Sequence, residues 1–176
     1  MVKANVFDIS KWFLEHNLDT PRNTFKGNMK LQKLLFFSQL ISLAQNGETL
    51  FDERFSAFEN GMVVEPVRKM YKDNLNNILN YKSQKLNEKQ VEILELTKKI
   101  YGMEDADTLS EMSHEFTYWN KYYNYSRDEN NYKDKNKAEI PNEELSKELD
   151  NIRDVLYAFK VIEGKDYKRK LEEIDY

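Results

Sequence analysis

The sequence contains no cysteine and only two histidines, His16 and His114, among its 176 residues. Disulfides and thiol chemistry are therefore excluded, and no set of nitrogen and sulfur ligands for a zinc-type ion can be assembled. The carboxylates do not follow EF-hand spacing, and no Gly-x-Ser-x-Gly motif marks a nucleophile. We interpret His114 as a structural, hydrogen-bonded histidine. We expect no catalytic residues, no metal site and no cofactor.

Glycine and proline are also scarce, with five and three residues. Their scarcity disfavours a turn-rich all-β fold and glycine-rich phosphate-binding loops. No apolar run reaches the roughly 20 residues that a membrane span needs, and no N-terminal signal sequence is present. We expect a cytoplasmic protein that does not enter a membrane.

An excess of basic charge is missing too, because 27 basic residues face 31 acidic ones and the net charge is −4. Broad binding to a phosphate backbone depends on dense Lys and Arg, so this balance disfavours nucleic acid as the partner. Two local hints remain, the basic run 168–170 and the tyrosine- and lysine-containing stretch 118–132. Aromatic residues among basic ones can stack on bases. The same stretch can be a solvated loop that covers the core edge, or a protein-binding surface.

The most apolar stretch is 28–46, which lies between Gly27 and Gly47. Leu31, Leu34 and Leu35 recur at helical spacing, while Phe36 and Phe37 extend the apolar surface onto a second face. A helix that is apolar on more than one face is normally buried by several neighbours. We predict a central helix over 28–46, around which the rest of the chain packs.

The remaining segments predict a mainly α, compact single-domain helical bundle with a small β-hairpin near 50–64, turning at Asn60-Gly61. Capping and turn residues place the other helices. The ranges are 5–17, a helix opening at Glu65-Pro66, 87–101, a short helix from Thr108, 117–124 and one helix over 141–163, followed by a charged tail.

Four ordered segments carry a family resemblance. They are MKLQKLLFF (29–37), LFDERFSAF (50–58), NGMVVEPV (60–67) and LSEMSHEFTYW (109–119). Together they resemble the Panacea domain, the SocA-like antitoxin family, which also occurs in phage-associated proteins. The resemblance covers about residues 6–125. The chain departs from the pattern at Phe58, where tryptophan is usual, and at Met62 and Tyr118, where proline is usual.

The resemblance implies a helical domain without enzymatic activity that neutralises a toxin by direct contact, and in one branch hands the toxin to a Clp-type protease. We expect a protein partner, a toxin, and leave the oligomeric state open. A second hypothesis is a phage or mobile-element protein that modulates host defence or regulation, with DNA binding as one route. The resemblance assigns a mostly structural role to the motif residues Lys30, Leu31, Gln32, Lys33, Leu34, Phe58, Gly61, Pro66, His114 and Trp119. The predicted partner surface consists of Tyr122, Tyr123, Tyr125, Arg127 and Tyr132.

Overall fold

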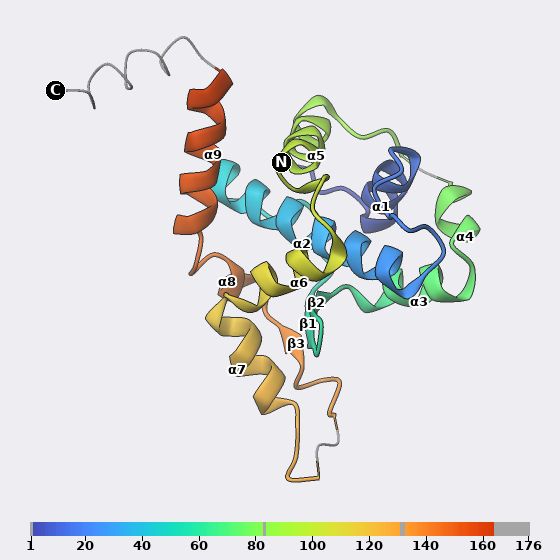
Figure 1. Cartoon of the computed structure of the whole chain (residues 1–176), viewed down its shortest axis with the longest axis vertical. Helices are drawn as coiled ribbons and strands as arrows, with labels where there is room; N and C mark the ends of the chain where they lie inside the picture. The colour runs from blue at the N-terminus through green and yellow to red at the C-terminus, as the bar shows by residue number, and fades with distance from the viewer. Residues whose placement is uncertain (1, 83, 131–132, 164–176) are drawn as a thin grey trace, which may run out of the picture.

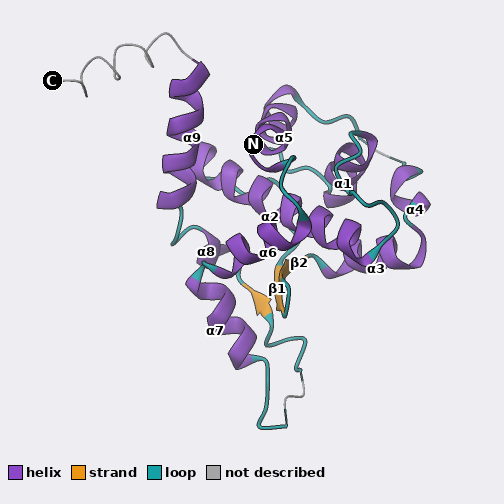
Figure 2. Cartoon of the chain, in the orientation of Figure 1, coloured by secondary structure: helices purple, strands orange, loops and turns teal. Residues whose placement is uncertain are grey.

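The structure is a computed structural model that describes residues 2–82, 84–130 and 133–163. Helices dominate it, and three short strands form one small sheet (Figures 1 and 2). This architecture confirms the prediction of a mainly α fold with a small β-hairpin. The helices are α1 (Val6–Glu15), α2 (Phe25–Asn46), α3 (Glu65–Asn74), α4 (Asn76–Leu79), α5 (Glu88–Tyr101), α6 (Ala106–His114), α7 (Thr117–Tyr125), α8 (Asn142–Leu145) and α9 (Asp150–Glu163). The strands are β1 (Phe55–Phe58), β2 (Gly61–Val63) and β3 (Glu139–Ile140).

Helix α2 runs through the middle of the molecule and is buried along most of its length (Figure 1). Helices α1, α3, α5, α6 and α9 and strand β2 all contact it. Leu31, Leu34 and Phe36 are completely buried, and the Phe37 ring stacks on Tyr101 with 4.2 Å between ring centroids. The prediction of a buried central helix is confirmed, because neighbours cover both of its apolar faces.

The start of α2 differs from the prediction. The helix begins at Phe25, with Thr24 as the N-cap whose hydroxyl accepts from the Gly27 backbone N–H at 3.0 Å. Gly27 is therefore inside the first turn and does not bound the helix. A Cβ atom there would lie 2.4 Å from the Pro21 carbonyl oxygen and 2.7 Å from the Tyr71 hydroxyl, so the preceding loop requires glycine at this position. At the other end, Gly47 caps the helix in the left-handed conformation (φ 69°), as predicted.

The predicted hairpin is present as β1 and β2, which pair antiparallel across the Asn60-Gly61 turn. Strand β3, which was not predicted, adds to the other edge of β1, with Phe55 opposite Ile140. The sheet order is β2-β1-β3. Ala138, directly before β3, is completely buried.

Two helix boundaries in the second half of the chain were predicted wrongly. Helix α6 begins at Ala106, because Asp105 is its N-cap and accepts from the Thr108 N–H at 2.8 Å. The single helix predicted over 141–163 is divided into α8 and α9. Between them, the Glu148 carboxylate turns toward α7 and accepts from the Thr117 N–H at 3.0 Å. Glu148 thus supplies an N-terminal cap to a helix about 30 positions earlier in the chain, and the break places it there. The charged tail lies outside the described residues.

Candidate functional site: a cavity between α2, the hairpin and α3

Polar side chains of α2 fix the connection from the hairpin to α3. Gln32 accepts from the Val64 N–H at 2.8 Å and donates to the Asn28 side-chain oxygen at 3.3 Å. Asn28 in turn donates to the Arg68 carbonyl oxygen at 3.0 Å. These bonds satisfy buried backbone groups at the start of α3, which has no side-chain cap of its own. Pro66 lies in the first turn of α3, where its missing N–H is not needed.

Lys33 is the most unusual residue of this region. Its side chain is completely buried, and its ammonium group donates to the Met62 carbonyl oxygen at 2.9 Å. Burial lowers the pKa of Lys33 from 10.5 to about 7. Gly61 (φ 93°), at the hairpin turn, lies in close contact with this side chain. A Cβ atom at Gly61 would lie 2.9 Å from the Lys33 Cε and 2.1 Å from the Ser113 hydroxyl oxygen. Only glycine fits between the turn, Lys33 and α6.

Lys30 points away from this connection and joins α2 to the end of α5. Its ammonium group donates to the Gly102 carbonyl oxygen at 2.8 Å. Burial lowers the Lys30 pKa, and the nearby carboxylates of Asp105 and Glu104 partly oppose that effect. Leu31 and Leu34, the apolar members of the same motif, lie in the core.

The motif residues Trp119 and His114 support the hairpin from α7 and α6. The Trp119 indole N–H donates to the Phe58 carbonyl oxygen at 2.8 Å, and the His114 ring stacks on Trp119 with 3.9 Å between centroids. Burial and the charge of Lys33 lower the His114 pKa. The Lys133 ammonium group lies 3.0 Å from the centroid of the Phe58 ring, so the loop after α7 reaches this edge of the hairpin. Burial lowers the Lys133 pKa to about 8.

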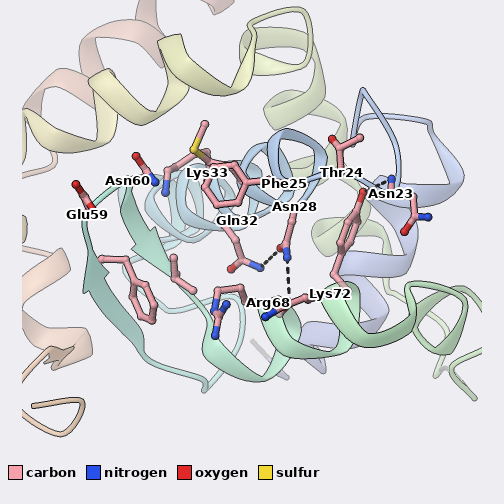
Figure 3. A pocket seen from close by; sticks show the side chains of 14 residues that line it. Asn23, Thr24, Phe25, Asn28, Gln32, Lys33, Glu59, Asn60, Arg68 and Lys72 are labelled. Carbon is pink, nitrogen blue, oxygen red and sulfur yellow. Dashed lines mark hydrogen bonds between the residues drawn. The ribbon is translucent and has the colours of Figure 1, made fainter. Parts of the chain in front are cut away.

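These contacts surround a cavity of about 400 Å³ between the N-terminal half of α2, the β1–β2 turn and α3 (Figure 3). The volume is typical of a site that takes a small ligand or one or two side chains. Gln32 and Asn28 contribute from α2, Arg68 and Lys72 from α3, and Glu59 and Asn60 from the hairpin turn. The remaining lining residues are Asn23, Thr24, Phe25, Met29, Lys33, Phe58, Val63 and Tyr71.

Comparison with known protein families matches residues 31–120 to the family described as antitoxin SocA-like, Panacea domain. The match covers half of the chain. The protein belongs to the antitoxin SocA-like family. No curated protein and no solved structure matches the chain. Within the described ranges, no helix is long and apolar enough to cross a bilayer.

The stretch that matches the SocA-like family includes the cavity residues Gln32 and Lys33 of α2, the hairpin turn and α3. It brings Gln32, Lys33 and Phe58 together at the cavity, with Gly61 against Lys33. Trp119, with His114 stacked on it, bonds to the hairpin at Phe58. Lys30 bonds to the end of α5, and Pro66 lies in the first turn of α3. In this SocA-like chain, Gln32, Lys33 and Phe58 therefore form part of the cavity wall, whereas Leu31 and Leu34 hold α2 in the core.

The predicted partner surface lies beyond the matched stretch, on α7 and the loop that follows it. Tyr125 is 64% exposed, whereas Tyr123 stacks on Trp119 at 5.1 Å and carries the Arg127 guanidinium 4.3 Å above its ring. The Lys121 ammonium group covers the Tyr122 ring at 5.1 Å. Tyr132 lies outside the described residues. None of the four described residues of this surface lines the cavity, and the rings of Tyr122 and Tyr123 are already half-covered by their own neighbours.

Of the residues that line the cavity, sequence reasoning singled out Gln32, Lys33 and Phe58. Those that it missed include Phe25, Asn28, Arg68 and Lys72. Phe25 is the first residue of α2, and it is 67% exposed. Asn28 precedes Gln32 by one helical turn, a spacing that allows two side-chain amides to bond. That spacing could have been read from the sequence. The position of α3 opposite α2 could not.

Proposed function

We propose that this protein is an antitoxin that neutralises a protein toxin by direct contact. Its membership in the antitoxin SocA-like family carries the proposal. The folded body supports it, because the buried hydrogen bonds of Asn28, Gln32 and Lys33 fix the hairpin and α3 on α2 in advance. A surface that is ordered before binding loses less conformational entropy when a partner docks.

Neutralisation can take two routes. In the first, the bound protein covers the functional surface of the toxin. In the second, it presents the toxin to a Clp-type protease. The two routes predict different toxin levels in the cell, because only the second removes the toxin as well as silencing it.

Co-expression with the product of the neighbouring gene tests the proposal. We expect that product alone to arrest growth, co-expression to restore growth, and the two proteins to purify as a complex. Absence of both rescue and complex would refute the proposal. Toxin abundance, followed in cells with and without the Clp-type protease, separates the routes: unchanged abundance during rescue indicates blocking, and a protease-dependent fall indicates delivery.

Salt-sensitive binding to duplex DNA by the purified protein, without any toxin rescue, would instead support the hypothesis of a mobile-element protein that acts on host regulation.

A further inference from the structure

The cavity between α2, the hairpin and α3 has apolar walls and basic groups at its opening. Phe25, Met29, Phe58 and Val63 contribute the apolar surface. Phe25 is 67% exposed although it is a phenylalanine in the first turn of the central helix. Because Phe25 lines the same cavity as Met29, Phe58 and Val63, its ring belongs to a shared apolar lining, and an apolar groove of this kind is typical of a binding site.

Basic side chains from α3 lie at the same opening. Arg68 and Lys72 line the cavity, and Arg68 is held in place by a bidentate bond to Glu65, at 2.8 and 2.9 Å. Lys72 is exposed and forms no ion pair with any residue that the structure describes. Glu59, at the opposite side on the hairpin turn, is the single acidic residue among those that line the cavity. Because Glu65 compensates the Arg68 charge, Lys72 supplies the positive charge that the α3 side presents at this opening.

The walls are fixed before any ligand arrives. Gln32 bonds the Val64 N–H, Asn28 bonds the Arg68 carbonyl oxygen, and Lys33 bonds the Met62 carbonyl oxygen. These three residues lie on one side of α2, and their hydrogen bonds fix the positions of β2 and α3, which face it. The cavity is thus a preformed site, and the polar floor offers amide groups to a ligand.

We propose that this cavity is the anchor site for the partner: it takes one aromatic or large aliphatic side chain from an exposed segment of the toxin, with a carboxylate of that segment beside Lys72. The apolar walls fit the side chain, and Lys72 complements the carboxylate. The inference rests on the proposed antitoxin function and assigns its principal contact to the α2–α3 face. The tyrosines of α7 then contribute secondary contacts.

A first experiment probes the cavity without any toxin. N-acetyl-L-phenylalanine, which carries a ring and a carboxylate, is titrated into the isotope-labelled full chain and followed by amide chemical shifts. We expect saturable shifts at the residues that line the cavity, and at least several-fold weaker binding of N-acetyl-L-phenylalaninamide, which lacks the carboxylate. Equal binding of the two compounds overturns the role of Lys72, and the absence of saturable shifts at the cavity overturns the site.

A second experiment uses the product of the neighbouring gene and matched variants of the full chain. Phe25→Ala is compared with Met103→Ala, since Met103 is 94% exposed and does not line the cavity. Lys72→Glu is compared with Lys89→Glu, at an exposed position on α5. All four positions are on the surface, so the variants should keep the wild-type fold, which circular dichroism and thermal unfolding check.

We expect Phe25→Ala and Lys72→Glu each to weaken toxin binding about 10- to 100-fold, while the two control variants stay within about twofold of wild type. If wild type binds the toxin and the cavity variants bind equally well, while Tyr125→Ala abolishes binding, the anchor is on α7 and this inference is wrong although the antitoxin function stands. If wild type itself neither binds nor rescues, the proposed function fails, and the titration with N-acetyl-L-phenylalanine still decides whether the cavity is a binding site.

Discussion

Replacing Lys33 with methionine should change the pH dependence of stability in one defined direction. Methionine keeps an unbranched side chain of similar length and removes the buried amine. In the native state the Lys33 pKa is about 7, against 10.5 for the unburied group. Between these values the native protein holds Lys33 neutral while the unfolded chain carries the proton. The unfolded state then binds more protons, so wild-type stability rises as pH rises through this interval.

The size of the effect follows from the same two pKa values. Within the interval, each pH unit changes the free energy of unfolding by about 1.4 kcal/mol. The advantage of Lys33→Met over wild type should therefore shrink by about 2–3 kcal/mol between about pH 7.5 and pH 9.5. Below about pH 6 both states of the wild type carry the charge, and the difference becomes constant. Loss of the bond to the Met62 carbonyl oxygen subtracts a constant of about 1–3 kcal/mol at every pH.

Urea unfolding of both proteins at several pH values from about 6 to 9.5 measures the difference. Lys30→Met is the matched control on the same helix. The carboxylates of Asp105 and Glu104 oppose the lowering of the Lys30 pKa, so its difference from wild type should vary less with pH. A Lys33→Met difference that stays flat across the interval would refute the assignment of a neutral, buried Lys33, and so would one that grows as pH rises.

Two further predictions concern contacts that hold the segment 49–63 against α2. Gly61→Ala should lower the free energy of unfolding by about 2–4 kcal/mol, because the left-handed conformation and the close contacts with Lys33 and Ser113 both oppose a Cβ atom. Gly47→Ala should cost only about 1 kcal/mol in urea unfolding, since Gly47 has open space around it; equal losses would contradict the packing at Gly61. Gln39→Leu should destabilise by about 3 kcal/mol or more, because the buried Gln39 amide accepts from the Leu50 N–H at 2.7 Å and donates to the Phe51 carbonyl oxygen at 3.1 Å. A loss within about 0.5 kcal/mol in the same measurement would show that the segment 49–54 does not depend on α2 for its hydrogen bonds.

The sequence predicted those parts of the fold that depend on neighbouring residues. The capping box of Asn87 and Gln90, the proline in the first turn of α3 and the left-handed Gly47 are all local features, and each marks its helix end correctly. The apolar surface of α2 was equally readable, because burial on several faces leaves a composition that polar surface helices lack.

The errors came from contacts between distant parts of the chain. Gly27 was interpreted as a helix boundary. It lies inside the helix, where the preceding loop and the Tyr71 hydroxyl leave no room for a Cβ atom. The break after α8 exists because Glu148 caps α7, and strand β3 exists because Ile140 pairs with Phe55. No local pattern encodes these partnerships.

The cavity, too, combines residues that the sequence pointed to with residues that only the packing of distant segments brings in. On α2, the cavity residues Gln32 and Lys33 belong to a motif visible in the sequence, whereas Arg68 and Lys72 reach the cavity only through the packing of α3 against α2. The family resemblance therefore located one wall, and the structure supplied the opposite wall and the exposed Phe25 at the opening.

The central claim is that the protein acts by binding a toxin, and its most direct test uses purified components. The product of the neighbouring gene is assayed for toxin activity while this protein is added in increasing amounts. The account predicts a saturable heat of binding by calorimetry in the same buffer, and on the blocking route toxin activity falls to background in proportion to the complex formed. A toxin that keeps full activity in a large excess of the folded protein, with no heat of binding, would contradict it.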